Sequence, residues 1–291
     1  MRQLLRIELY KIFKRPRTYI AFAVIALIIL LLQVALKFSG EDYAGILMSG
    51  LKDTFEVPPE EILNGYLVCY TILNLLLVHV PILVALIAGD MISGEANMGT
   101  LRLLVSRPIG RTRLLMIKFI AASIYTLILL IWVAFLALGI SVLMFGTNSL
   151  FVARETESNI ISAADVLWRY GAAFLFAGIG LITVAALSFM LSTFADNSIG
   201  PIVATVCILV ILTILTELQI PFYDTVKPYL FTTHMLGWKG FFYVKGADGV
   251  TIEGSIGNMK AIIKSGIILL GYTTIFLGIS IWYFRKKNIL T

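Results

Sequence analysis

The run Met116–Phe145, MIKFIAASIYTLILLIWVAFLALGISVLMF, decides the fold class of this protein. Its only charged side chain is that of Lys118, close to its start. A membrane-spanning helix needs about 20 mostly apolar residues, so this run is long enough to cross a bilayer and extend beyond it or tilt. Five further runs pass the same test, at about 19–36, 66–88, 166–191, 199–218 and 262–284. The pattern therefore predicts six membrane-spanning helices.

The composition excludes a soluble protein. Hydrophobic residues make up 59% of the 291 residues and charged residues only 14%, whereas soluble domains carry about 25% charged residues. So little polar surface cannot keep so many apolar side chains in water. The same numbers exclude disordered, collagen-like and coiled-coil chains. We expect an all-α polytopic membrane protein that forms one transmembrane domain over residues 1–291.

The distribution of charge predicts the orientation in the membrane. Lys and Arg residues gather in residues 1–17, 90–118 and 285–287, whereas acidic residues gather between the first two spans. Cytoplasmic loops carry an excess of Lys and Arg, so both termini are predicted to be cytoplasmic in a multi-pass protein of the cell membrane. The net charge of +6 then reflects topology and membrane lipid, and we expect no nucleic acid as a partner.

Two segments outside the spans are predicted to lie at the membrane surface. Met1–Arg17 is consistent with an interfacial helix, in which one face carries Leu5, Leu9, Ile12 and Phe13, while Lys11, Lys14 and Arg15 point elsewhere. The alternative is a basic flank that only sets orientation. The external segment, residues 219–261, combines many glycines with many aromatic residues, and this predicts short interfacial or re-entrant helices before the last span.

Motifs for catalysis and nucleotide binding are absent from the sequence. It contains no HExxH metal motif, no GxSxG elbow and no GxxxxGK[ST] phosphate-binding loop. We therefore predict no catalytic residues, no metal site and no cofactor in this chain. The two cysteines, Cys69 and Cys207, lie far apart in apolar runs and are interpreted as small hydrophobic residues.

Polar residues inside the spans are few. Asn74 and His79 lie in the second span and are candidate residues of a translocation pathway, although such groups more often form hydrogen bonds between helices. Pro81 follows them, and a proline in a span indicates a kink.

The loop between the second and third spans, residues 90–115, is the most informative segment: DMISGEANMGTLRLLVSRPIGRTRLL. Helical spacing separates two sets of residues, with Met98, Leu101, Leu104 and Val105 on one face and Glu95, Gly99, Arg102 and Ser106 on another. Pro108 and Gly110 then end the helix. A short amphipathic helix joined to two spans would suit contact with a soluble partner, and the alternative is a positively charged loop with an incidental helix.

This loop resembles the hallmark loop of the permeases of type-2 ATP-binding-cassette (ABC) exporters. The residues that carry the resemblance are Gly94-Glu95, Gly99-Thr100, Leu103-Leu104, Ser106-Arg107-Pro108, Arg111 and Lys118. In that family the loop forms a coupling helix that inserts into a cleft on the ATPase subunit. The resemblance implies a coupling element made of Glu95, Gly99, Thr100, Arg102 and Pro108. It also implies that Arg111 and Lys118 hold the start of the third span at the cytoplasmic surface.

The resemblance further implies a permease that works as a dimer with two separate ABC ATPase subunits. The partners bind ATP and Mg²⁺, and the pathway lies between the two permease subunits. The expected function is export of an amphipathic, lipid-like, peptide or ion cargo. Two alternatives stay open: a polytopic membrane enzyme acting on lipid, which an essential His79, Asn74 or His234 would favour, and a non-transporting membrane anchor of a complex.

Overall fold

The computed structural model confirms a helical protein with helices suited to a membrane. It describes residues 2–49, 63–101, 110–153, 158–217, 225–242 and 256–287. In this part of the chain, five helical runs are long and apolar enough to cross a membrane, and a sixth crossing is formed if a bent pair counts as one span. The bounds of the helices that make up the five runs are α2 (Pro16–Ser49), α8 (Arg111–Ala134) with η1 (Phe135–Ile140) and α9 (Ser141–Phe145), α10 (Ala163–Phe194), α11 (Ile199–Glu217) and α14 (Met259–Lys286).

The bounds of the helices extend past the predicted spans. The runs predicted at 166–191, 199–218 and 262–284 agree with α10, α11 and α14 within three residues at either end. The run predicted at 116–145 begins five residues too late, and the run predicted at 19–36 continues to Ser49 beyond non-helical dihedral angles at Ser39. A run of apolar residues marks the portion of a helix that can lie in the hydrocarbon of a membrane. The helix itself continues into the charged residues on either side of that run.

The second predicted span, 66–88, is not one straight helix. It consists of α4 (Gly65–Leu75) and α5 (His79–Ala88), which are bent by 53° relative to each other. Pro81 has no N–H group, and its ring displaces the carbonyl of Leu77 one turn earlier, so the helix breaks at residues 76–78. The kink indicated by Pro81 is thereby confirmed.

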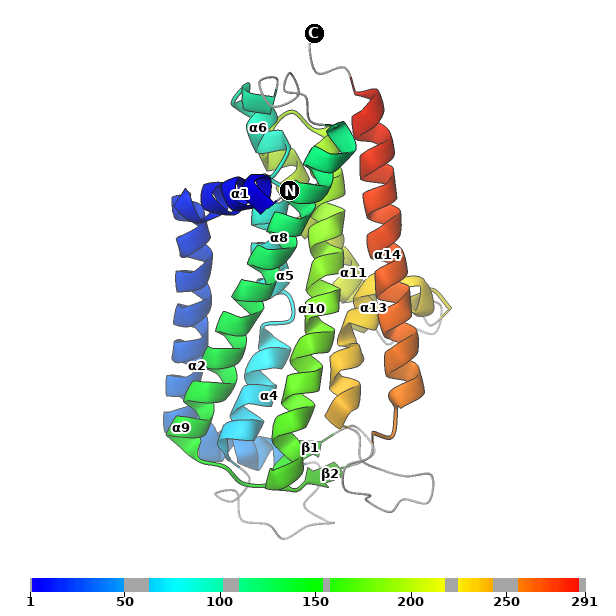
Figure 1. The fold of residues 1–291 in the computed structure, drawn as a ribbon. Helices are drawn as coiled ribbons and strands as arrows, with labels where there is room; N and C mark the ends of the chain where they lie inside the picture. Colours follow the sequence, from blue (N-terminus) through cyan, green and yellow to red (C-terminus); the bar gives the residue numbers. More distant parts are fainter. Residues whose placement is uncertain are drawn as a thin grey trace.

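Short helices and a β-hairpin lie at the two ends of the molecule. At one end α1 (Arg2–Lys14) lies across the bundle, at the same end of the molecule as α6 (Ser93–Asn97) and the end of α14 (Figure 1). At the other end β1 (Leu150–Ala153) and β2 (Ser158–Ile161) form an antiparallel hairpin that the sequence pattern did not predict. Between α11 and α14, the described residues 225–242 contain three short helices: η2 (Lys227–Tyr229), α13 (Phe231–Met235) and η3 (Leu236–Phe242).

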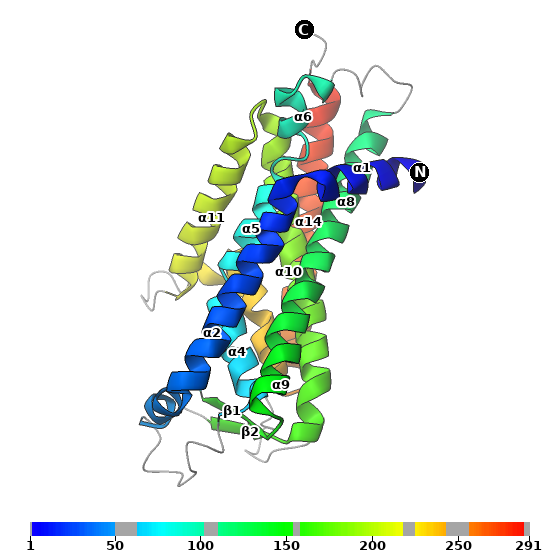
Figure 2. The ribbon, with the colours of Figure 1, turned by 90° about the vertical axis from the view of Figure 1, so that its left-hand side faces the viewer.

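Helix α10 is the centre of the bundle. It contacts α5, α8, α11, α14 and η3, and 61% of its apolar window is buried, the highest share among the candidate spans. Figure 2 shows α11 and α2 at the outside of the bundle, and only 17% and 22% of their apolar windows are buried. Gly, Ala and Ser residues along α10 allow this close packing.

Two helices approach each other closely at Gly65, the first residue of α4. A Cβ atom added there would lie 2.6 Å from the carbonyl oxygen of Ser141 and 2.6 Å from the Cα of Val142, both backbone atoms of α9. Backbone atoms cannot rotate away, so Gly65→Ala is expected to destabilise the protein by about 1–3 kcal/mol. Thermal unfolding in detergent measures the change.

Gly171→Ala is the matched control, because a Cβ atom at that position of α10 meets no heavy atom within 4 Å. Alanine is the better helix former, so this control should be neutral or stabilising by up to about 1 kcal/mol. Equal unfolding temperatures for the two variants would contradict the close packing of α4 on α9.

Candidate functional site

Four charged side chains form a closed ion cluster at the end of the molecule where α1 lies. The ion cluster consists of Glu8, Lys11, Glu95 and Lys118. The Lys118 Nζ lies 2.8 Å from Glu8 Oε2 and 2.7 Å from Glu95 Oε2. The Lys11 Nζ lies 2.9 Å from Glu8 Oε1 and 2.9 Å from Glu95 Oε1. Each carboxylate is therefore paired with both ammonium groups, and the formal charges cancel.

Three separate elements supply these side chains. Glu8 and Lys11 lie one turn apart on α1, Glu95 lies in the first turn of α6, and Lys118 lies near the start of α8. Lys118 is only 1% exposed, Glu95 4% and Glu8 5%. Moving such groups out of water carries a large penalty, which is offset only where opposite charges meet at close range. The cluster therefore holds α1, α6 and α8 in one relative position.

A second set of ion pairs attaches the start of the same loop. The carboxylate of Asp90 is buried and pairs with Arg15 and, at 3.1 Å, with Arg17. A Cβ atom on Gly94 would lie 2.3 Å from Asp90 Oδ1, so the position next to Glu95 accepts only glycine without rearrangement. Gly94 thus allows the backbone to lie close to Asp90, and Glu95 pairs with Lys11 and Lys118.

Hydrogen bonds also join this loop to α10. The hydroxyl of Ser192 accepts hydrogen bonds from the backbone N–H groups of Ile92 and Ser93, at 3.2 and 3.0 Å. The Ser93 hydroxyl donates to the carbonyl of Gly89 at 2.7 Å. Residues 90–95 are therefore bound on two sides, by ion pairs and by hydrogen bonds.

The tip that follows is exposed. Gly99 has φ +71°, which favours glycine and ends the short helix α6, and the Thr100 hydroxyl donates to the carbonyl of Glu95 at 3.3 Å. The prediction of one continuous helix with Glu95 and Gly99 on the same face is therefore wrong. Asn97, Met98, Gly99 and Thr100 all face solvent, and Met98 is 58% exposed.

The remaining predicted coupling residues divide into two groups. Arg102 and Pro108 lie outside the described residues. Arg111 begins α8 and donates from Nη1 to the carbonyl oxygens of Arg285 and Lys287, at 3.1 and 2.8 Å. It therefore joins α8 to the end of α14. Lys118, predicted to hold the start of the third span at the membrane surface, is 1% exposed and pairs with Glu8 and Glu95.

The two predicted pathway residues are not brought together. The Asn74 amide donates to the carbonyl of Tyr70 at 2.9 Å, and Nδ1 of His79 lies 2.9 Å from the carbonyl of Leu75. Asn74 therefore bonds to the preceding turn of α4, and His79 reaches back across the break to the last residue of α4. His234 bridges two elements, with Nε2 2.9 Å from the Pro228 carbonyl and Nδ1 3.1 Å from Ser265 Oγ.

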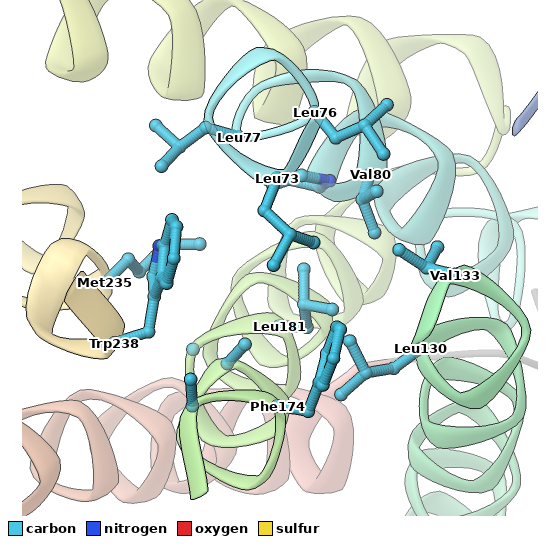
Figure 3. Close-up of a pocket in the computed structure, with 14 residues that line it drawn as sticks. Leu73, Leu76, Leu77, Val80, Leu130, Val133, Phe174, Leu181, Met235 and Trp238 are labelled. Atoms are coloured by element: carbon cyan, nitrogen blue, oxygen red, sulfur yellow. The ribbon is translucent and has the colours of Figure 1, made fainter. Parts of the chain in front are cut away.

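An apolar cavity of about 80 Å³ lies beside the break between α4 and α5 (Figure 3). Side chains from α4, α5, α8, α10, α13 and η3 surround it, and none of them is charged. Asn74 and His79 are not among the residues that line it. The cavity is therefore separate from both the ion cluster and the predicted polar pathway residues.

Sequence reasoning identified Glu95 but missed the partners that bury it. Lys11 was expected to point away from the apolar face of α1, and Glu8 was not singled out. The signal for Glu8 is its position, since it lies one turn from Leu5 and from Ile12, which are both on the apolar face. An acid on an apolar helix face needs a cation from another element.

The ion cluster should control stability more strongly than a surface ion pair. Lys118→Met leaves Glu8 and Glu95 buried without their main partner, and the expected destabilisation is about 3–5 kcal/mol. Asp196→Asn removes an exposed pair with Lys287, in which the Asp196 side chain is 81% exposed, and should change stability by about 0–1 kcal/mol. Thermal unfolding in detergent compares the two. A Lys118→Met variant as stable as Asp196→Asn would contradict the role of the cluster.

The cluster also predicts a dependence of stability on pH. Burial by itself raises the pKa of Glu8, but Lys118 and Lys11 outweigh burial and hold this pKa below its ordinary value of 4.5. Burial lowers the pKa of Lys11, but hydrogen bonds to Glu8 and Glu95 outweigh it and hold this pKa above 10.5.

Stabilisation from Glu8 is therefore present above pH 4.5 and lost as the pH falls through its folded pKa. Stabilisation from Lys11 is present below pH 10.5 and lost as the pH rises through its folded pKa. We expect the unfolding temperature to be highest between these values, and Glu8→Gln to remove most of the decline on the acid side. The same acid decline in wild type and Glu8→Gln would show that other groups are responsible.

Comparison with known proteins places the chain in a family. Residues 26–290 match the family described as "Protein of unknown function (DUF2705)". The chain is also 26% identical over 215 residues to "Uncharacterized protein YhcI" of Bacillus subtilis (strain 168). This similarity covers 70% of the chain but only 63% of that relative, which is less than two thirds of its length. Because the family match includes all the elements from α4 to α14, the protein belongs to the DUF2705 family.

Proposed function

We propose that the protein is the permease subunit of an ABC transporter of the cell membrane. It would cross the membrane six times, with α4 and α5 acting as one bent span. Two permease subunits would form the translocation pathway between them, and separate ATPase subunits would drive it. ATP and Mg²⁺ would be bound by those ATPases, because this sequence has no phosphate-binding loop.

The observation that carries this proposal is the attachment of α6 to two other helices by the ion cluster. A segment that transmits force must move together with the helices it acts on. Glu95 is paired with Lys11 of α1 and with Lys118 of α8, so displacement of α6 would displace both helices. An incidental loop would have no need for buried charges at its base.

The structure suggests a division of tasks among the coupling residues. Glu95 and Arg111 are anchors, since Glu95 is buried and Arg111 binds the end of α14. Gly99 and Thr100 lie at the exposed tip beside Met98, where a soluble ATPase can reach them. An apolar side chain at the tip of a positively charged surface suits a cleft on a partner protein.

Orientation follows from the same end of the molecule. The end that carries α1, α6 and the end of α14 also carries the concentration of Lys and Arg residues (Figure 1). The positive-inside rule makes this end cytoplasmic, which is where ATPase subunits are found. In this orientation α1 lies at the cytoplasmic surface, with Leu5, Leu9 and Phe13 packed against the bundle and Ile7 and Tyr10 facing lipid headgroups.

The enzyme alternative rests on one geometric observation. The Pro228 carbonyl can only accept a hydrogen bond, so Nε2 of His234 donates to it, and in a neutral ring Nδ1 then accepts from the Ser265 hydroxyl. A serine paired with an oriented histidine is the arrangement of an activated nucleophile. However, neither residue lines the apolar cavity beside the break or the smaller cavity next to it, which Leu209 and Thr213 help to line. A structural link between α13 and α14 explains the contacts equally well, and Ser265→Ala decides between the two readings.

The proposal is tested by purifying the tagged protein from its native membrane and weighing the intact complex by native mass spectrometry. We expect two permease-sized and two ATPase-sized chains. Met98→Asp introduces a charge at the exposed tip and should weaken ATPase association at least about tenfold, which corresponds to about 1.4 kcal/mol. Folding should be unaffected, because the Met98 side chain is exposed.

Met259→Asp is the matched control, since Met259 is also an exposed methionine but lies at the start of α14, the opposite end of the bundle. It should retain the ATPase. A wild-type complex without any ATPase would reject the proposal and favour the enzyme. ATPase binding without any cargo-stimulated hydrolysis would favour the membrane anchor.

A further inference from the structure

The cavity beside the break in the second span is lined without polar side chains, apart from the indole N–H of one residue. Figure 3 shows Leu73, Val80 and Leu181 pointing into it. Trp238 and Met235 close one side, from η3 and α13. The volume is about 80 Å³, which is large for a protein interior, where voids larger than a water molecule are few.

Two features of the sequence create this space. The bend of 53° between α4 and α5 turns the span at residues 76–78, and the helix surface on either side of the bend cannot follow the straight surface of α10. On α10 itself, three of the five lining residues are small, namely Ala173, Ala177 and Gly180, and the other two are Phe174 and Leu181. Small side chains opposite a bend leave room that larger ones would fill.

Water is a poor occupant of this cavity. A buried water molecule makes about three hydrogen bonds to polar partners, and apolar cavities of this kind stay dry. The nearby amide of Asn74 donates to its own helix, and His79 lies against the carbonyl of Leu75. An empty cavity is also unfavourable, because its lining atoms lose their dispersion contacts on one side.

The position of the cavity identifies the apolar occupant. The break lies midway along the α4–α5 span, and the cavity is partly open to the outside of the bundle. At the middle of a bilayer the surroundings are the ends of lipid acyl chains. An engineered cavity of about 150 Å³ accepts benzene, so about 80 Å³ accommodates the last few carbons of a chain and no headgroup.

We propose that this cavity is a binding site for the end of an acyl chain of a membrane lipid, inserted between α5, α8 and α10. The chain fills the space that the bent span leaves. The site binds the hydrocarbon chain and does not discriminate between lipid headgroups. This inference concerns the folded bundle in its membrane and does not depend on ATPase binding or transport.

The test uses the full-length protein in phosphatidylcholine vesicles that contain a small fraction of phosphatidylcholine with a diazirine at the end of one acyl chain. Illumination inserts the carbene formed there, with loss of N₂, into side chains that touch the chain end. Peptide mass spectrometry then locates the adducts. Val80 and Leu130 line the cavity and are only 6% and 8% exposed, so adducts on them require a chain inside the bundle.

Leu175 and Ile131 report ordinary lipid contact, because they are 78% and 67% exposed on α10 and α8. We expect adducts on all four residues in the wild-type protein. Ala177→Leu fills the cavity and should abolish the adducts on Val80 and Leu130 while those on Leu175 and Ile131 persist. Gly171→Leu adds the same side chain where a Cβ meets nothing within 4 Å, and should leave all adducts unchanged.

Adducts confined to Leu175 and Ile131 in the wild-type protein would overturn the proposal, as would adducts on Val80 that survive Ala177→Leu. Should Ala177→Leu fail to fold, Leu181→Ala provides the second variant. It enlarges the cavity, so labelling of Val80 should rise relative to Leu175. Unchanged relative labelling in Leu181→Ala would also overturn the proposal.

Discussion

Pairing of buried charges at one end of the bundle is the constraint on which the arrangement of α1, α6 and α8 depends. Lys118 sits on the same helix as a long apolar run and is almost completely removed from water. Such a charge persists in a folded protein only if opposite charges surround it. Glu8 and Glu95 do so from two different elements, and Lys11 completes the neutral cluster by pairing with both acids.

The same constraint accounts for the shape of the loop after the second span. Asp90 and Glu95 are both directed inward, which draws the backbone between them onto the bundle and leaves Gly94 no room for a side chain. The exposed tip begins directly afterwards, where Gly99 turns the chain. A rigid base and an accessible tip are what a contact between a membrane protein and a soluble partner requires, and the proposed permease function rests on this combination.

The middle of the bundle follows a different rule. No buried charge network is found there among the described residues, and packing depends on the fit between the broken span and the small residues of α10. Where that fit is incomplete, an apolar cavity is left beside the break between α4 and α5. The bent span is therefore held by ion pairs where it continues into α6 and by apolar packing at its break.

Much of the fold could be predicted from the sequence because each span must bury its own backbone hydrogen bonds in an apolar environment. This local requirement produces runs of about 20 apolar residues, and the predicted runs agree with α10, α11 and α14 within three residues. Pro81 signalled the kink because its missing N–H acts within one turn. The hairpin β1–β2 was missed because its strands have only four residues each, too few for a clear alternating pattern.

The sequence by itself determined that this is a helical membrane protein, which end carries the positive charge, and that Glu95 belongs to an unusual loop. Those properties depend on composition and on neighbours within a few turns. Only the tertiary structure decided that Glu95 is an anchor and not a contact at the tip. Its partners Lys11 and Lys118 come from residues far away in the sequence, and no periodicity within the loop encodes which charges meet when three helices pack together.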